Sequence, residues 1–290
     1  MQISDKITVV CLLRIEKTGK LGISVRLNLL ANLELELRRR FSKSADKLLF
    51  QFPTLGGGSA ALAISTDSLD RTAEIKETIN TALNSVLGGQ NYLDSEVLAF
   101  PATSLKTNVE NSDLPIPILV FSRVQIPLKE LRWWLRSGVL SRINVMIGFG
   151  SHNLIFLGRC CSLTDVRVMV SNITQSFRET SKTYTVVGVP PKYCRDKEIE
   201  LSGPQFPFHT AIKLETVTAS FLSEMEVLIS KFGHLFKGLR KEDILGFTPG
   251  QMDMTVNYKA SYISEAFDFV VAVGDLKDVV DTVTWIDFHP

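Results

Sequence analysis

Residues 91–147 decide the fold predicted for this chain. They comprise NYLDSEVLAFP (91–101), a polar loop, LPIPILVFSRVQIP (114–127) and LKELRWWLRSGVLSRINVMI (128–147). The two segments that end in proline are predicted to be strands that end at Pro101 and Pro127. Pro127 suits the first turn of a helix, because its fixed φ fits there and its missing N–H is not needed. The stretch therefore predicts strand, loop, strand, helix and strand, and it contains no catalytic motif.

The composition is typical of a folded globular protein. A chain of 290 residues can bury a sizeable core, in one large domain or two smaller ones. The net charge is +1, so the composition shows no overall basic character of the kind that duplex binding normally needs, which leaves a local basic patch open. The mean hydropathy of +0.14 is high for a soluble monomer. Either apolar surface that binds partner subunits or a large core would explain this value.

The sequence predicts no membrane span, metal centre or disulfide. The first apolar run, residues 7–13, is too short to cross a bilayer and is followed by charge. No CxxC motif is present, so we expect reduced thiols. No histidine lies at metal-ligand spacing from another histidine or a cysteine. The cysteines and histidines are Cys11, Cys160, Cys161, Cys194, His152, His209, His234 and His289.

The N-terminal part predicts strands and one clear helix. Strands are expected at residues 6–14, 48–52 and 60–65. A helix is expected over residues 69–87, because its apolar residues fall mainly on one face and Gly88 follows its end. Residues 23–41 suit an alternating strand or a helix, and the arginine run at its end favours the helix.

The rest of the chain predicts more strands around a long helix. Apolar residues recur at steps of three and four over residues 210–237, which is the strongest periodicity in the chain and predicts a helix there. We call these apolar residues the apolar stripe of the long helix. No internal repeat is evident, and the order of elements predicts an α+β fold. The expected strands cover residues 143–147, 154–157, 166–170, 184–189, 252–258, 267–273 and 279–288.

No pattern predicts a catalytic or cofactor site. Residues 56–58 are three glycines without the lysine of a phosphate-binding loop, so we interpret them as a turn. Cys194 lies beside Arg195, which can lower a thiol pKa, but a thiol without a function is the simpler interpretation. Trp133 and Trp134 point about 100° apart on a helix, which favours core or interface over base stacking. We therefore expect neither an enzyme nor a cofactor.

Several segments, in their order along the chain, resemble a known family. They are ITVVCLL (7–13), SEVLAFP (95–101), the segments over 114–147 and VVDTVTWIDFHP (279–290). The family is triplex capsid protein 2, the duplicated subunit of the herpesvirus capsid triplex, and the chain resembles a divergent member. The resemblance implies a structural protein of the virion capsid, assembled in the host nucleus. A second copy of itself, a different triplex subunit and the major capsid protein are the implied partners.

The resemblance also implies a domain organisation. An α+β fold would have a β-rich trunk, barrel-like or sandwich-like, with helices and an inserted arm domain. Residues 1–127 would form the first part of the trunk, 128–250 the arm and 251–290 strands that return to the trunk. Residues 151–207 depart from the family's helical arm, because they alternate like strands.

Two segments are expected to form assembly surfaces: residues 120–135 and the apolar stripe of the long helix. The interface residues are Leu131, Trp133, Trp134, Leu214, Phe221, Met225, Leu228 and Phe232. Two alternatives remain open. One is another viral scaffold or matrix protein, and the other is an enzyme with no recognisable motif. Alanine changes at His152, His209 and His234 that abolish a turnover would favour the enzyme.

Overall fold

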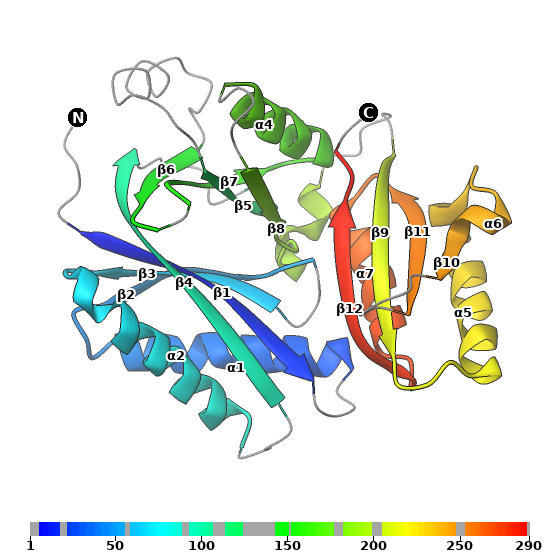
Figure 1. Ribbon diagram of the computed structural model, residues 1–290, viewed down its shortest axis with the longest axis horizontal. Helices are drawn as coiled ribbons and strands as arrows, with labels where there is room; N and C mark the ends of the chain where they lie inside the picture. The colour runs from blue at the N-terminus through cyan, green and yellow to red at the C-terminus, as the bar shows by residue number, and fades with distance from the viewer. Residues whose placement is uncertain are drawn as a thin grey trace.

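The computed structural model describes residues 6–17, 22–55, 59–88, 93–106, 114–123, 143–150, 152–176, 182–198, 205–247 and 253–288. An antiparallel sheet of eight strands and one of four strands make up this part of the chain, with helices packed on them (Figure 1). The predicted α+β fold is confirmed. Among the described helices, none has the length and apolar character that crossing a membrane would require.

The first module occupies one half of the eight-stranded sheet. Its strands lie in the order β2-β3-β1-β4. The segment that suited strand or helix forms α1, because its buried residues recur at helical spacing along one face. The arginines at its end pair with Glu34 and Glu36 one turn earlier. The elements are β1 (Ile7–Lys17), α1 (Ile23–Phe41), β2 (Lys47–Pro53), β3 (Ser59–Thr66), η1 (Leu69–Arg71), α2 (Thr72–Val86) and β4 (Leu93–Lys106).

The second module occupies the other half of the same sheet. Its strands lie in the order β6-β7-β5-β8. The helix predicted after Pro127 lies outside the described residues. The elements are β5 (Ile116–Arg123), β6 (Ile143–Gly148), β7 (Leu154–Cys160), α4 (Leu163–Ser176) and β8 (Lys182–Val187).

The eight-stranded sheet closes on itself like a barrel. Strand β4 of the first module pairs with β6 of the second, with Ala102 opposite Gly148. At the other edge, Thr54 after β2 bridges Gly188 after β8. The backbone N–H of Val189 donates to the Pro53 carbonyl at 2.9 Å beside this bridge. Both edges of the sheet are therefore joined.

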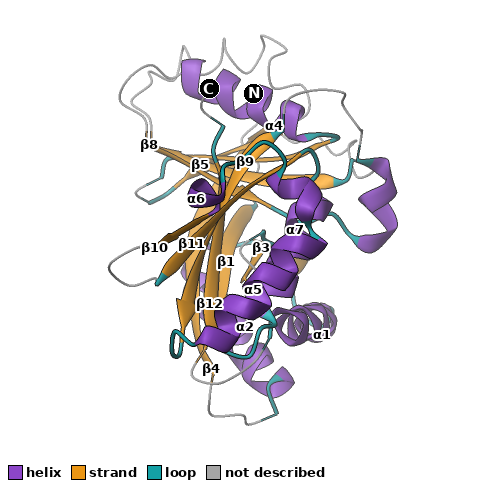
Figure 2. Ribbon diagram, turned by 90° about the vertical axis from the view of Figure 1, so that its right-hand side faces the viewer, coloured by secondary structure: helices purple, strands orange, loops and turns teal. Residues whose placement is uncertain are grey.

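The third module forms the four-stranded sheet, with strands in the order β10-β11-β9-β12. Figure 2 shows α5 and α7 on one side of its strands. A short helix, η2 (Lys192–Lys197), precedes it. The elements are β9 (Phe206–Leu214), α5 (Ala219–Lys231), η3 (Gly233–Phe236), α6 (Lys241–Ile244), β10 (Leu245–Phe247), β11 (Met254–Ala260), α7 (Ile263–Gly274) and β12 (Val279–Ile286).

The three modules repeat one topology. When the strands of each module are numbered one to four along the chain, every module has the spatial order two, three, one, four. All pairs are antiparallel. This is the strand order of the ferredoxin-like β-α-β-β-α-β arrangement. The chain therefore contains a threefold structural repeat, which no pattern in the sequence revealed.

Three predicted elements were wrong. Residues 166–170 and 267–273, predicted as strands, lie in helices α4 and α7. Their apolar runs are short, and such runs do not separate a strand from a buried helix. The helix predicted from residue 210 begins at Ala219, because residues 206–214 form β9. Thr218 caps α5 by accepting the Phe221 N–H at 3.0 Å.

The third module packs on the first through a buried charge. Arg26 of α1 is 1% exposed, and its Nη1 lies 3.4 Å from Oδ1 of Asp281 in β12. Arg14 of β1 reaches the other oxygen of Asp281 at 2.6 Å. Next to this cluster, Gly274 packs so closely on Ile23 that a Cβ would have no space. The strands of residues 251–290 pair with β9, and the predicted domain boundaries stay a prediction.

Candidate functional site

The four-stranded sheet has one buried face and one accessible face. Along β9, Phe206, Phe208 and Ile212 point to the helices and are buried. The alternate positions face the other way, because successive strand residues point to opposite sides. On that second face, Val283 and Trp285 of β12 are 40% and 45% exposed. We call this second side of the sheet the open face.

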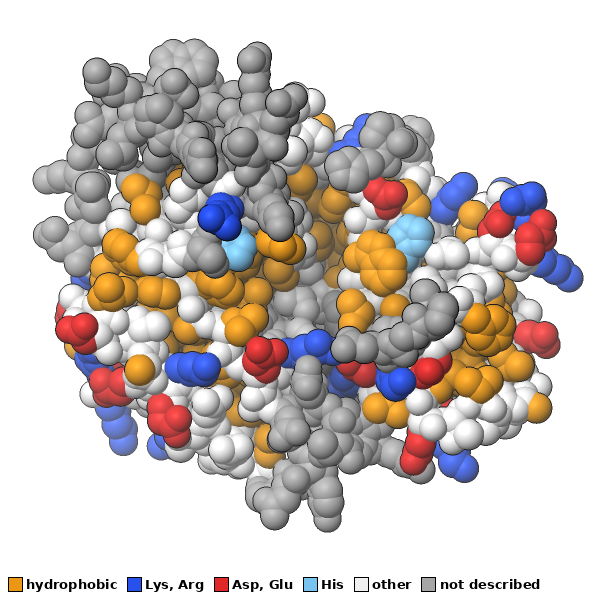
Figure 3. Space-filling view, viewed as in Figure 1, with side chains coloured by type: hydrophobic (Ala, Val, Ile, Leu, Met, Phe, Trp, Pro, Cys, Tyr) orange, Lys and Arg blue, Asp and Glu red, His pale blue; other side chains and the backbone are white. Residues whose placement is uncertain are grey.

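His209 lies at the centre of the open face. It stands opposite Asn257 of β11 on one side and Trp285 of β12 on the other. The imidazole stacks on the indole, with ring centroids 5.4 Å apart and an angle of 22° between the planes. Figure 3 shows a histidine among hydrophobic side chains on the right-hand lobe, on the face turned to the viewer. The open face therefore offers an apolar surface beside a titratable ring.

A hydrogen-bonded chain fixes the tautomer of this ring. The Asn257 Nδ2 donates to the backbone carbonyl of Asp243 at 2.7 Å. The amide oxygen of Asn257 is thereby turned toward His209, whose Nδ1 lies 2.8 Å away. A carbonyl oxygen only accepts, so Nδ1 carries the proton. The neutral imidazole then has its lone pair on Nε2, which can accept a proton or bind a metal ion.

Charged residues line one end of the open face. Lys213 lies between Asp253, which precedes β11, and Asp281 on β12. Its Nζ is 3.4 Å from Oδ2 of Asp253. Because Asp281 also contacts Arg14 and Arg26, this row connects the open face to the first module.

A second histidine closes one end of the barrel. The His152 ring meets Phe100, Phe121 and Tyr184 edge-to-face, with centroids 5.5 to 5.9 Å apart. Phe100 and Phe121 contact each other across the barrel interior at 4.7 Å. Phe121 is buried, the His152 ring is half-buried and Tyr184 is 56% exposed, so we interpret this aromatic packing as the closure of one end of the barrel.

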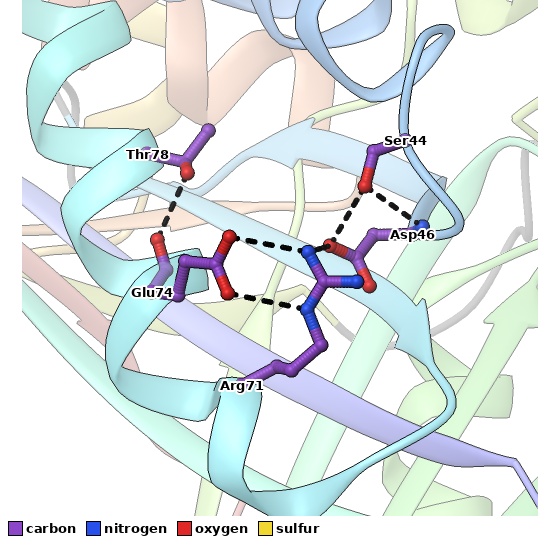
Figure 4. A network of polar contacts seen from close by, with 5 residues as sticks. All are labelled: Ser44, Asp46, Arg71, Glu74 and Thr78. Carbon is purple, nitrogen blue, oxygen red and sulfur yellow. Dashed lines mark hydrogen bonds and ion pairs between the residues drawn. The ribbon is translucent and has the colours of Figure 1, made fainter.

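A polar network in the first module is structural. Arg71 at the start of α2 contacts Asp46 at 3.0 Å and Glu74 at 3.2 Å (Figure 4). Ser44 donates to the same Asp46 carboxylate at 3.1 Å. These carboxylates raise the pKa of Arg71. The network ties the α1–β2 turn to α2.

Glu198 caps a helix of the third module. Its carboxylate accepts the backbone N–H of Ser264 at 3.2 Å, in the first turn of α7. Burial raises the pKa of Glu198 to about 7, although the hydrogen bonds from Ser264 lower it. The next contact, between Arg195 and Asp268 at 3.0 Å, fixes η2 on the same helix. Glu198 therefore joins the connecting segment to α7.

The predicted interface residues divide into two groups. Leu131, Trp133 and Trp134 lie outside the described residues. The others come from β9, α5 and the turn after α5, and they pack within the chain. Leu214, Phe221 and Met225 are buried, whereas Leu228 and Phe232 are partly buried against the same core. Their role in assembly stays a prediction, because the core of the chain already accounts for their contacts.

The remaining histidines and cysteines form no second site. His234 is exposed on η3, 3.8 Å from Glu265. Cys11 is buried, and burial raises its pKa to about 12. Cys161 contacts Asp165 at the start of α4. Within the described ranges, no group of three His, Cys, Asp or Glu residues could hold a metal ion. His289 and the Cys194 side chain lie outside those ranges.

Comparison with known proteins gives a structural likeness only. No protein-family model and no curated protein matches the chain. A mutant chlorite dismutase of Candidatus Nitrospira defluvii with cyanide aligns at a TM-score of 0.42 and 12% identity, over 66% of this chain and 93% of its own. The same enzyme with imidazole aligns at 0.44 and 11% identity, over 64% and 92%. Likeness at this level assigns no activity to this chain.

The capsid prediction is contradicted by these comparisons. The aligned structures are chlorite dismutases and not herpesvirus triplex proteins. The predictions of a structural capsid subunit, of a protein that is not an enzyme and of a place in the virion and host nucleus are therefore wrong.

The segments that carried the resemblance also fold differently from the prediction. Pro101, expected to end a strand, lies inside β4, which continues to Lys106. The apolar stripe interpreted as one helix is divided between β9 and α5.

The central group of the site was not predicted from the sequence. Residues 206–214 read FPFHTAIKL, in which His209 occupies the polar phase of an alternating strand. The long helix predicted from residue 210 hid this alternation. Trp285 could have been found by the same alternation. It lies between Thr284 and Ile286 in a tail that was correctly predicted as a strand, so its side chain points to the opposite face from theirs.

Proposed function

We propose that this protein is an enzyme that binds a small planar molecule on the open face, where Nε2 of His209 accepts a proton from it. The observation that carries the proposal is the chain from the Asp243 carbonyl through Asn257 to Nδ1 of His209. Such a chain fixes both the orientation and the tautomer of a general base. A surface histidine that serves no such role would not need this chain of hydrogen bonds.

The neighbouring groups support a planar substrate. Trp285 is 45% exposed beside the imidazole, so its remaining surface is free to cover an aromatic or conjugated ring. Lys213 and Arg14 place positive charge at the end of the face, although each is paired with a carboxylate. We therefore expect neutral or weakly acidic planar molecules to bind better than flexible aliphatic ones.

Saturation-transfer NMR with a set of phenols, aromatic acids and aliphatic acids of matching size tests the proposal. Phenols and aromatic acids should receive saturation from the wild-type chain and lose most of it with His209→Ala or Trp285→Ala. His234→Ala is the matched control, because that histidine is exposed on the same module and away from the sheet register of His209. Binding that is equal in all three variants would contradict the proposed site.

The binders then serve as leads for the reaction. A compound that binds through His209 and carries an acidic C–H should exchange that proton with solvent deuterium faster with wild type than with His209→Gln. Exchange at the same rate with both proteins would reduce His209 to a binding residue and contradict its role as a base.

A further inference from the structure

We propose that the open face and the first module form one composite groove, which takes a planar ring that carries an uncharged apolar tail. The ring would lie on Trp285 beside His209, and the tail would extend to Leu98 on the first module. This assignment rests on the proposed function, since it names the class of molecule that the same site would take. It also gives the site a second wall, which the sheet of the third module does not supply.

The two modules meet at one ion pair beside the open face. Nη2 of Arg14 on β1 lies 2.6 Å from Oδ2 of Asp281 on β12. Asp281, Val283 and Trp285 alternate along β12, so their side chains share the open face. Leu12 lies two positions before Arg14, so both side chains are on the barrel-facing side of the first sheet. The open face is therefore continuous with that side of the first module.

The first module has an uncovered apolar side chain on its barrel-facing side. Leu98 of β4 stands directly opposite Leu12 of β1, so the two side chains share a face. Leu12 packs against the buried cluster of the barrel interior, whereas Leu98 is 44% exposed. The length of β4 explains the difference, because its pairing with β6 covers only residues 102–106. The part of β4 that carries Leu98 thus extends beyond β6.

Apolar side chains line both sides of the groove next to the ion pair. Alternate residues of a strand are about 6.5 Å apart, so Val283 follows Asp281, and Leu12 follows Arg14, at one such step. Val283 is 40% exposed. Figure 3 shows the surface hollowed between the left-hand and right-hand lobes, with hydrophobic side chains on both sides of the hollow. An apolar tail attached to a ring on Trp285 would lie between these two walls.

The charges at this end of the groove favour an uncharged tail. Arg14 and Arg26 both contact Asp281, and Nζ of Lys213 lies 3.4 Å from Oδ2 of Asp253. An acidic tail would have to displace one of these carboxylates, and a basic tail would approach three cations. A hydrocarbon tail disturbs none of these pairs, and its transfer from water to the apolar walls is favourable.

The dependence of affinity on tail length tests the groove. NMR titration of the full chain compares para-methylphenol with para-propylphenol and para-hexylphenol. Each methylene group that is fully buried should tighten binding about fourfold. Because both walls are partly exposed, we expect the hexyl compound to bind at least about tenfold more tightly than the methyl compound, with the propyl compound between them.

Matched leucine substitutions separate the groove from unspecific binding of alkyl chains. Leu98→Ser should remove most of the gain with tail length and leave the affinity for para-methylphenol unchanged. Leu35→Ser is the control, because Leu35 is 68% exposed on α1, which packs on the opposite side of the first sheet. Trp285→Ala should weaken all three phenols by a similar factor, since each ring would lie on the indole. Near-ultraviolet circular dichroism shows whether each variant keeps its fold.

Isotope-filtered NOE spectra locate the two ends of the bound hexyl compound. Its ring protons should contact the indole of Trp285, and its terminal methyl group should contact the methyl groups of Leu98 and Val283. Contacts of the tail with Leu35 rather than Leu98 would overturn the groove.

The groove and the proposed function can be told apart because the shortest phenol tests the ring site alone. If para-methylphenol binds through His209 and Trp285 but tail length has no effect, or if the gain survives Leu98→Ser, the groove is rejected and the proposed function stands. If para-methylphenol does not bind, or binds equally to wild type, His209→Ala and Trp285→Ala, the proposed function is rejected, and the groove with it.

Discussion

The barrel and the third sheet are built from the same module, yet they use their sheet faces differently. In the barrel, two modules turn these faces toward each other, and the interior holds Phe121 and other buried side chains, with the partly buried Phe100 packed against them. The third sheet has no such partner within the described chain, and its open face holds His209 and Trp285. The difference indicates that pairing of modules, rather than their topology, decides whether a face becomes core or site.

The two histidines show the same difference at the level of single residues. His152 is surrounded by three aromatic rings, which use the imidazole as a packing surface. His209 has one aromatic neighbour and a hydrogen-bonded chain that directs its lone pair outward. A histidine in an aromatic cluster is therefore not by itself a better functional candidate than one on an accessible strand.

The largest expected effect is in the barrel interior. Phe121 is 2% exposed, so Phe121→Ala should lower the free energy of unfolding by about 3–5 kcal/mol, as measured by urea denaturation. Trp285→Ala removes a larger ring from the open face, and we expect a loss below about 1 kcal/mol. Equal losses at the two positions would contradict the distinction between a filled barrel and an open face.

The joint between the two regions should be nearly as sensitive. Asp281→Ala leaves the buried Arg26 guanidinium without its carboxylate, so we expect a loss of about 3–5 kcal/mol. Adding Arg26→Met to this variant should recover most of the loss, because the buried charge is then gone. Thermal unfolding of the single and double variants measures both. A double variant as unstable as the single one would show that packing, rather than charge, holds the joint.

Glu198 should make the third module sensitive to pH. Its pKa rises from 4.5 to about 7 on folding, so between these values the unfolded chain loses a proton that the folded chain keeps. Stability should therefore fall as the pH rises from about 4.5 to 7, by at most about 3 kcal/mol. Glu198→Gln should flatten this part of the profile in thermal unfolding at several pH values. Parallel profiles for both proteins would show that Glu198 does not titrate in this range.

Asn257→Ala is expected to have the smallest effect on stability, but a specific effect on the tautomer of His209. Loss of its hydrogen bonds should cost about 1 kcal/mol. Long-range nitrogen–proton NMR should show His209 as the Nδ1–H tautomer in wild type and as a mixture of tautomers in the variant. His152 provides the internal control, because its ring should give the same spectrum in both. A mixture already present in wild type would contradict the fixed base.

The sequence alone determined the fold class and most of the local structure. The strands at residues 7–17, 47–53 and 59–66 and the helix α2 follow from alternation, helical periodicity and the glycine after the helix. These signals are local, because each depends on neighbours within a few positions. The α+β class followed from their order. Helices α4 and α7 were missed, because a short apolar run fits a buried helix as well as a strand.

Only the tertiary structure decided the repeat, the closed barrel and the candidate site. The three modules share a strand order and no visible sequence pattern, since many apolar sequences satisfy the same packing. Asp243, Asn257, His209 and Trp285 come from four separate elements and become neighbours through the register of the third sheet. That register depends on long-range pairing and burial, so no single stretch of the sequence contains it.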